Sequence, residues 1–202
     1  MLLSAVFFIL TRQFKFWRYS ARPPWYHQNR ESGGIDMASI LYPTELAAVE
    51  AFGRAALPET ERDGRERCAA ILCGRTGYRL GHVWRGFHNN VILQAVCIAV
   101  SSVFCGRTAL VHTHPRCTCH AGEQFSGERD AHGRVRRLGD ACVPGMGRIY
   151  RIWLVSPEGN LSCWDGINPP LLAGQLMDEH GAPLRIRTLC GSRLHGWIAQ
   201  MN

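Results

Sequence analysis

The sequence predicts an α+β domain in which a mixed β-sheet is flanked by helices. Apolar residues recur at helical spacing in one clear segment, between residues 44 and 58. Elsewhere, short apolar runs bounded by turn-forming residues indicate strands. With 202 residues and 46% hydrophobic content, the chain can bury a full core, and its length favours one domain with appendages.

The expected helix begins at Pro43-Thr44, because threonine is a favourable N-cap. Pro58 is expected to end the helix, since proline interrupts helical hydrogen bonding. The charged residues 59–65 are then expected to form a loop. The apolar face of the helix consists of Leu46, Val49, Phe52 and Ala56.

A strand pair is expected next. Residues 68–73 form a short apolar run, and Arg75-Thr76-Gly77 is a turn that leads to a partner strand at 78–84. Residues 86–90 are expected to be loop. The apolar run 91–104 is ambiguous, because its length favours a buried helix and its β-branched residues favour a strand.

The next predicted strand covers residues 108–112 and is followed by a loop at 115–125. Ser126 is expected to cap a helix that runs towards Leu138. A strand at 149–155 is expected to be central, because its apolar run is nearly continuous.

The end of the chain is expected to be less regular. Glu158-Gly159 is a turn that leads to a strand at 161–164. From residue 169 onward the sequence looks irregular, with a short helix as one option at 171–177. Residues 169–202 are therefore treated as a C-terminal extension of a domain that covers 37–168.

The first 36 residues form a separate, irregular segment in this interpretation. Residues 1–10 are apolar but too short to span a bilayer, so no transmembrane span is expected. One reading is a start codon assigned too early, with Met37 as the true first residue. The other is a short membrane-associating stretch whose aromatic residues lie at the interface; these are Phe14, Phe16, Trp17, Tyr19 and Trp25.

Nine cysteines without a repeated spacing make a poor disulfide framework and fit a reducing compartment. The segment Cys117-Thr118-Cys119-His120 is the exception. It is either a second metal site or, because no second C-x₂-C pair is present, a loop that packs near the histidines upstream.

The net charge of +7 includes a cluster formed by Arg134, Arg136 and Arg137. Such a cluster is either a solvated face or a surface for an acidic partner. Because no aromatic residues are interleaved with these arginines, we expect no binding of nucleic acid.

The most specific motif is His112-Thr113-His114-Pro115, at the end of a predicted strand. Side chains alternate across a strand, so two histidines at spacing two point the same way. Imidazole is a good ligand for Zn²⁺, and one carboxylate from another element would complete a three-ligand site with a position left for water.

At these residues the chain resembles the JAB/MPN (JAMM) zinc metallopeptidase superfamily, and in particular a bacterial branch associated with polymorphic toxins and secretion systems. The family pattern is an upstream glutamate, H-x-H-P, a loop, a serine, and an aspartate three residues later. The opening of that branch is similar to Arg65-Glu66-Arg67-Cys68-Ala69-Ala70-Ile71-Leu72, and its ending to Trp153-Leu154-Val155-Ser156-Pro157-Glu158-Gly159-Asn160-Leu161.

The resemblance implies a single JAB/MPN-like domain in which His112, His114 and Asp130 ligate Zn²⁺. Glu66 would be the general base, and Ser126 would donate a hydrogen bond to the developing oxyanion. Asp130 lies four residues after Ser126 instead of three, and Arg129 occupies the aspartate position. In a helical turn Asp130 would still reach the site; otherwise the site is broken, or one of two neighbours substitutes, Glu128 or His132.

The implied function is hydrolysis of a peptide or isopeptide bond in a protein or peptide substrate. The branch implies a bacterial effector or toxin domain, cytoplasmic in the producing cell and exported by a specialised system. The alternative is a non-catalytic scaffold of the same fold that has lost its zinc. A zinc-dependent base deaminase is excluded because it requires H-x-E with P-C-x-x-C.

Overall fold

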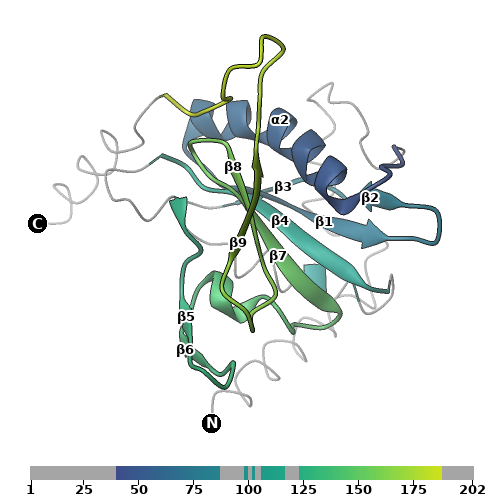
Figure 1. Cartoon of the computed structure of the whole chain (residues 1–202), viewed down its shortest axis with the longest axis vertical. Coiled ribbons are helices and arrows are strands. Elements are labelled where there is room, and N and C mark those ends of the chain that lie inside the picture. The colour runs from purple at the N-terminus through teal and green to yellow at the C-terminus, as the bar shows by residue number, and fades with distance from the viewer. Residues whose placement is uncertain (1–39, 87–97, 100–101, 103–105, 117–122, 188–202) are drawn as a thin grey trace, which may run out of the picture. The chain divides into compact units, whose positions relative to one another are not determined.

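The computed structural model describes residues 40–86, 98–99, 102, 106–116 and 123–187 (Figure 1). The predictions for the N-terminal segment, for the loop at 87–90 and for the cysteine segment 117–120 lie outside these residues. The described part is a mixed β-sheet with one long helix against it, which confirms the α+β class. Among the described residues, no helix combines the length and apolar character that a bilayer span requires.

Helix α2 (Glu45–Asp63) begins where the sequence predicts but ends later. Thr44 caps it, because its side-chain oxygen accepts a hydrogen bond from the N–H of Ala47 at 3.1 Å. Pro58 lies inside the helix, so the prediction that it ends the helix is wrong. The turn beyond Pro58 buries Thr60 completely, and this packing compensates for the lost hydrogen bond. Gly64, with φ of 66°, ends the helix instead.

The sheet has the order β2-β1-β4-β7-β8-β9, and β3 also pairs with β1. The pair β4–β7 is parallel and the other pairs are antiparallel, so the sheet is mixed as predicted. The predicted central strand at 149–155 is confirmed as β7. The strands are β1 (Arg67–Cys73), β2 (Tyr78–Leu80), β3 (Trp84–Arg85), β4 (Thr108–Thr113), β7 (Ile149–Val155), β8 (Asn160–Trp164) and β9 (Leu171–Gln175).

One expected strand differs in detail. The strand expected at 78–84 is divided into β2 and β3, with the N–H of Gly81 bonded to the carbonyl of Ala70 between them. In the ambiguous run 91–104, the described residues Ile98, Ala99 and Ser102 are helical.

The C-terminal stretch also differs from expectation, because the short helix considered at 171–177 is replaced by strand β9. Strand β9 satisfies backbone groups of β8 that would otherwise form an open edge. Leu176 and Ile186 belong to the same core as the sheet. The described part of the expected C-terminal extension is therefore built into the domain.

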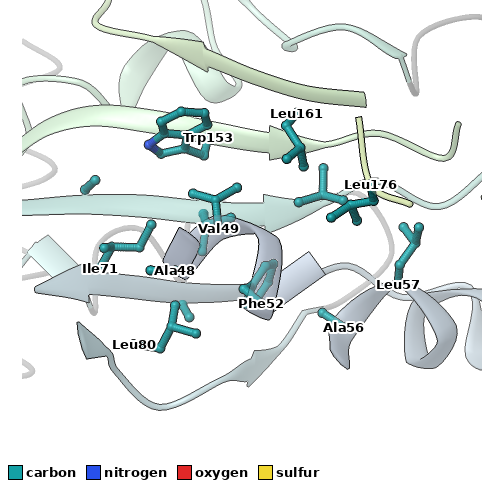
Figure 2. Close-up of a cluster of buried hydrophobic side chains, with 14 of the residues drawn as sticks. Ala48, Val49, Phe52, Ala56, Leu57, Ile71, Leu80, Trp153, Leu161 and Leu176 are labelled. Carbon is teal, nitrogen blue, oxygen red and sulfur yellow. The ribbon is translucent and has the colours of Figure 1, made fainter. Parts of the chain in front are cut away.

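The two faces of the sheet carry different cores. The odd-numbered residues of β1 and β4, such as Ala69 and Val111, pack against α2 in the cluster that Figure 2 shows around Phe52. The even-numbered residues, such as Cys68 and Leu110, pack on the other face with Ile98 and Ala99. By the same alternation, His112 lies on the face opposite α2.

The helix expected after Ser126 is absent, and a hairpin takes its place: β5 (Glu128–Arg129) and β6 (Val135–Arg137) (Figure 1). Gly127, with φ of 85°, turns the chain out of a helical path. At the tip, the side chain of Asp130 accepts hydrogen bonds from the N–H groups of His132 and Arg134, both at 2.9 Å. This local bonding favours a turn over a helix.

Candidate metal centre

Strand β4 brings the two histidines together. His112 lies in the strand, and the N–H of His114 donates to the carbonyl of Val155 at 3.2 Å, which extends the strand pairing by one residue. The two Nε2 atoms are 3.1 Å apart, so both side chains point the same way, as the spacing predicts. Both residues are buried.

The tautomer of His112 follows from its other ring nitrogen. Nδ1 lies 2.8 Å from the carbonyl oxygen of Trp153 in the neighbouring strand β7. A carbonyl can only accept a hydrogen bond, so Nδ1 carries the proton. In the neutral imidazole Nε2 then carries the lone pair and faces His114, and this is the form in which histidine binds a metal ion.

The third member of the group is Asp140, from the short 3₁₀ turn η4 (Asp140–Cys142). Its Oδ1 lies 3.3 Å from Nε2 of His112, and its Oδ2 lies 3.5 Å from Nε2 of His114. Burial alone would raise the pKa of Asp140, but the charge and hydrogen bonding of the two histidines hold this pKa well below its usual range. The three ligand atoms lie within 4.8 Å of one another, so the group could hold a metal ion.

Asp130, the aspartate expected from the resemblance, lies elsewhere. It is at the tip of the hairpin, 2.9 Å from the side chains of both Arg134 and Arg136. Hydrogen bonds from the Arg134 backbone and side chain lower the pKa of Asp130 to about 2. The two considered substitutes, Glu128 and His132, are exposed on the same hairpin and do not join the group.

Asp140 is not predicted from the sequence, because Ser126 looks like the N-cap of a helix. A helix would keep the acidic ligand within one turn of the serine, but the hairpin inserts residues 127–139 between them. The sequence signal that could have indicated the hairpin is the set of glycines at 127, 133 and 139, because glycine favours turns over a helix. In the structure each of these glycines has a positive φ.

Ser126 does lie at the site, but its contacts are with Asp140. Its N–H donates to Oδ2 of Asp140 at 2.7 Å, and its hydroxyl is 3.0 Å from the same oxygen. Ser126 is thus next to the metal-ligand group, which it contacts through the carboxylate of Asp140.

Glu66 reaches the same place from the start of β1. Cys68 pairs with His112 in the β1–β4 register, so Glu66, two residues earlier, lies opposite His114 on the same face. Its Oε2 is buried and has no hydrogen-bond partner in the described structure. Burial raises the pKa of Glu66 to about 7. The charge of His114 acts to lower this pKa, and the negative charge of Asp140 acts to raise it.

The backbone around Glu66 is held on both sides. The carbonyl of Glu66 accepts from the N–H of Gly86 at 2.8 Å. The next residue, Arg67, is buried and forms an ion pair with Asp63 at 2.6 Å, while it also donates to the carbonyl of Arg65 at 2.8 Å. These contacts fix the short link from α2 to β1, and the sequence reading does not single out Arg67 for this role.

Aromatic side chains border the group. The ring of Phe125 lies 6.3 Å from that of His112 and 5.7 Å from that of Trp164. Cys68 packs on this face. Cys142, which follows Asp140 in the same turn, forms no disulfide among the described residues, and neither do Cys73 and Cys163. Comparison with protein-family models, with curated proteins and with solved structures finds no match to this chain.

Proposed function

We propose that this chain is a zinc-dependent hydrolase that cleaves a peptide or isopeptide bond, the activity that its resemblance to the JAB/MPN superfamily implies. The observation that carries the proposal is the buried group His112, His114 and Asp140, with the carboxylate of Glu66 beside it. Two imidazoles and one carboxylate are a donor set typical of catalytic zinc, which keeps a position for water.

The residues fit a metal ion on physical grounds. Two imidazole nitrogens 3.1 Å apart and the ionised Asp140 bring three metal-ligand atoms together in a buried place. A cation there would offset the cost of burying the carboxylate. His112 is already in the tautomer that such a role requires.

Zinc in such a site lowers the pKa of a water molecule and polarises a carbonyl oxygen. Glu66 would accept the proton of that water on its carboxylate and pass it to the leaving amine. A general base is most effective when its pKa lies near the working pH, and burial brings the pKa of Glu66 to about 7. Asp140 stays ionised in the same place, so the two carboxylates are suited to different roles.

The ligand assignment is tested by a matched pair of variants. Asp140→Asn should strongly weaken zinc binding, because it removes the anionic ligand, whereas Asp130→Asn should bind zinc as the wild type does. Elemental analysis and a zinc titration of both purified variants measure this. Equal zinc loss in both variants, or full retention in Asp140→Asn, would reject the ligand set.

The catalytic role is tested with Glu66→Gln, which keeps the shape of the side chain but cannot accept a proton. Hydrolysis of quenched fluorescent peptides, linear and isopeptide-linked, should fall by roughly 10²- to 10⁴-fold while zinc content stays unchanged. Equal rates in wild type and Glu66→Gln, with zinc bound in both, would favour a non-catalytic scaffold.

A further inference from the structure

The carboxylate of Asp140 is used unequally. Oδ2 accepts two hydrogen bonds from Ser126, one from its N–H at 2.7 Å and one from its hydroxyl at 3.0 Å. Oδ1 is the oxygen nearest Nε2 of His112, at 3.3 Å. Oδ2 is therefore held in place beside His114, 3.5 Å from its Nε2, and Oδ1 faces His112.

The contact between the two residues is reciprocal. The N–H of Asp140 donates to the hydroxyl oxygen of Ser126 at 3.0 Å, and the N–H of Ala141 donates to the Ser126 carbonyl at 3.1 Å. Arg129 adds a further tie, because its Nε donates to the carbonyl of Ala141 at 2.7 Å. At the base of the β5–β6 hairpin, these hydrogen bonds from Ser126 and Arg129 thus hold the backbone of Asp140 and of the residue that follows it.

Gly139 makes this close approach possible. A Cβ atom at this position would lie 2.6 Å from the hydroxyl oxygen of Ser126 and 2.8 Å from the nitrogen of Gly127. Its φ of 139° is also one that side chains rarely adopt. The chain therefore carries glycine where Ser126 has to come within hydrogen-bond distance of the next residue, Asp140.

We propose that Ser126 is a positioning residue for Asp140 and acts on metal affinity, and not primarily as a donor to the oxyanion. A hydroxyl has one proton, and here that proton goes to Oδ2 of Asp140, while a lone pair accepts the N–H of Asp140. Groups that orient a metal ligand in this way set its geometry and the affinity of the site. This inference rests on the proposed metal binding at His112, His114 and Asp140.

The test is zinc affinity, measured by competition with a chromophoric chelator on the full chain. Ser126→Thr and Ser126→Val have the same shape and differ only in the hydroxyl, and Ser126 is exposed, so either side chain has room on its outer side. Ser126→Val and Ser126→Ala should bind zinc roughly 10- to 100-fold more weakly than wild type. Ser126→Thr should restore the affinity.

Ser102→Ala is the matched control. Ser102 is buried, and its hydroxyl oxygen also accepts a backbone N–H, that of Arg148 at 3.1 Å, at the end of β4 remote from His112. The Ser102→Ala variant should bind zinc as the wild type does, even if it lowers the melting temperature more than Ser126→Val does. A Co²⁺ absorption spectrum changed in Ser126→Val but not in Ser126→Thr would add that the hydroxyl shapes the ligand geometry.

The outcomes separate this inference from the proposed function. Zinc affinity equal in Ser126→Val, Ser126→Thr and wild type would overturn the positioning role and leave the metal site standing. Loss of hydrolysis in Ser126→Val at saturating zinc with unchanged affinity would return Ser126 to the oxyanion role. A wild-type chain that binds no zinc would overturn both proposals.

Discussion

At the scale of single residues, Glu66 and Asp140 show how similar carboxylates acquire different properties. Both are buried, so desolvation raises the pKa of each. Asp140 is compensated by two histidines and by Ser126, whereas Oε2 of Glu66 has no hydrogen-bond partner in the described structure. The result is one carboxylate that stays ionised and one whose pKa is raised to about 7.

The raised pKa of Glu66 predicts a pH-dependent stability in the zinc-free protein. The unfolded chain loses this proton near pH 4.5, but the folded chain keeps it up to about pH 7. Between these values the folded state binds more protons, so the stability falls as pH rises, and it levels off above pH 7. The full difference corresponds to roughly 3 kcal/mol.

Glu66→Gln should remove this decline, because glutamine stays neutral. Urea unfolding of the zinc-free wild type and variant at pH 5 and pH 8 measures the difference, and the variant should be the more stable protein at pH 8. Glu179→Gln, at an exposed position, is the control and should follow the wild type. A Glu66→Gln protein with the wild-type pH dependence would contradict the prediction.

At the scale of elements, the histidine strand is predictable and the acidic ligand is not. A continuous apolar run identifies β4, and period-two alternation then places both histidines on one face. No such period links Ser126 to Asp140, because a hairpin can hold any number of residues between two fixed ends. The position of Asp140 depends on hydrogen bonds between residues 14 positions apart, which local patterns do not reveal.

Strand β9 illustrates a second limit of local patterns. Residues 171–177 form a mostly apolar run that is too short to separate a strand from a helix by period. The free edge of β8 decides the outcome, since an extended segment there completes the sheet. Pro58 is a similar case. Local propensity predicts that the helix ends at this proline, but packing against the sheet stabilises α2 beyond it.

The inclusion of the β9 region in the core predicts a contrast between two leucines. Leu176 is fully buried, and one of its methyl carbons lies 2.6 Å from where a Cβ on Gly53 would be, whereas Leu172 is 64% exposed. Leu176→Ala should lower the free energy of unfolding by about 2–5 kcal/mol. Leu172→Ala should change it by less than about 0.5 kcal/mol. Similar losses in both variants, measured by urea unfolding, would argue against the assignment of Leu176 to the core.

At the scale of the whole molecule, the candidate metal centre is built from segments far apart in the chain. Glu66 precedes β1, the histidines end β4, and Asp140 follows the β5–β6 hairpin. Strand β4 lies between β1 and β7, so the histidines sit at the middle of the sheet and not on a peripheral loop. Unfolding would separate all of these residues at once.

A metal ion bound at this place should therefore stabilise the entire fold. A ligand that binds only the folded state adds roughly 2.7 kcal/mol at a free concentration 100 times its dissociation constant. Zinc should raise the melting temperature of the chelator-treated protein, and the increase should grow with zinc concentration. The double variant His112→Ala, His114→Ala should show no such increase, while a variant at the exposed His180, His180→Ala, should respond as wild type does. An equal zinc response in the double histidine variant would place the bound ion elsewhere, because the central strand would then have lost both imidazoles without losing the metal.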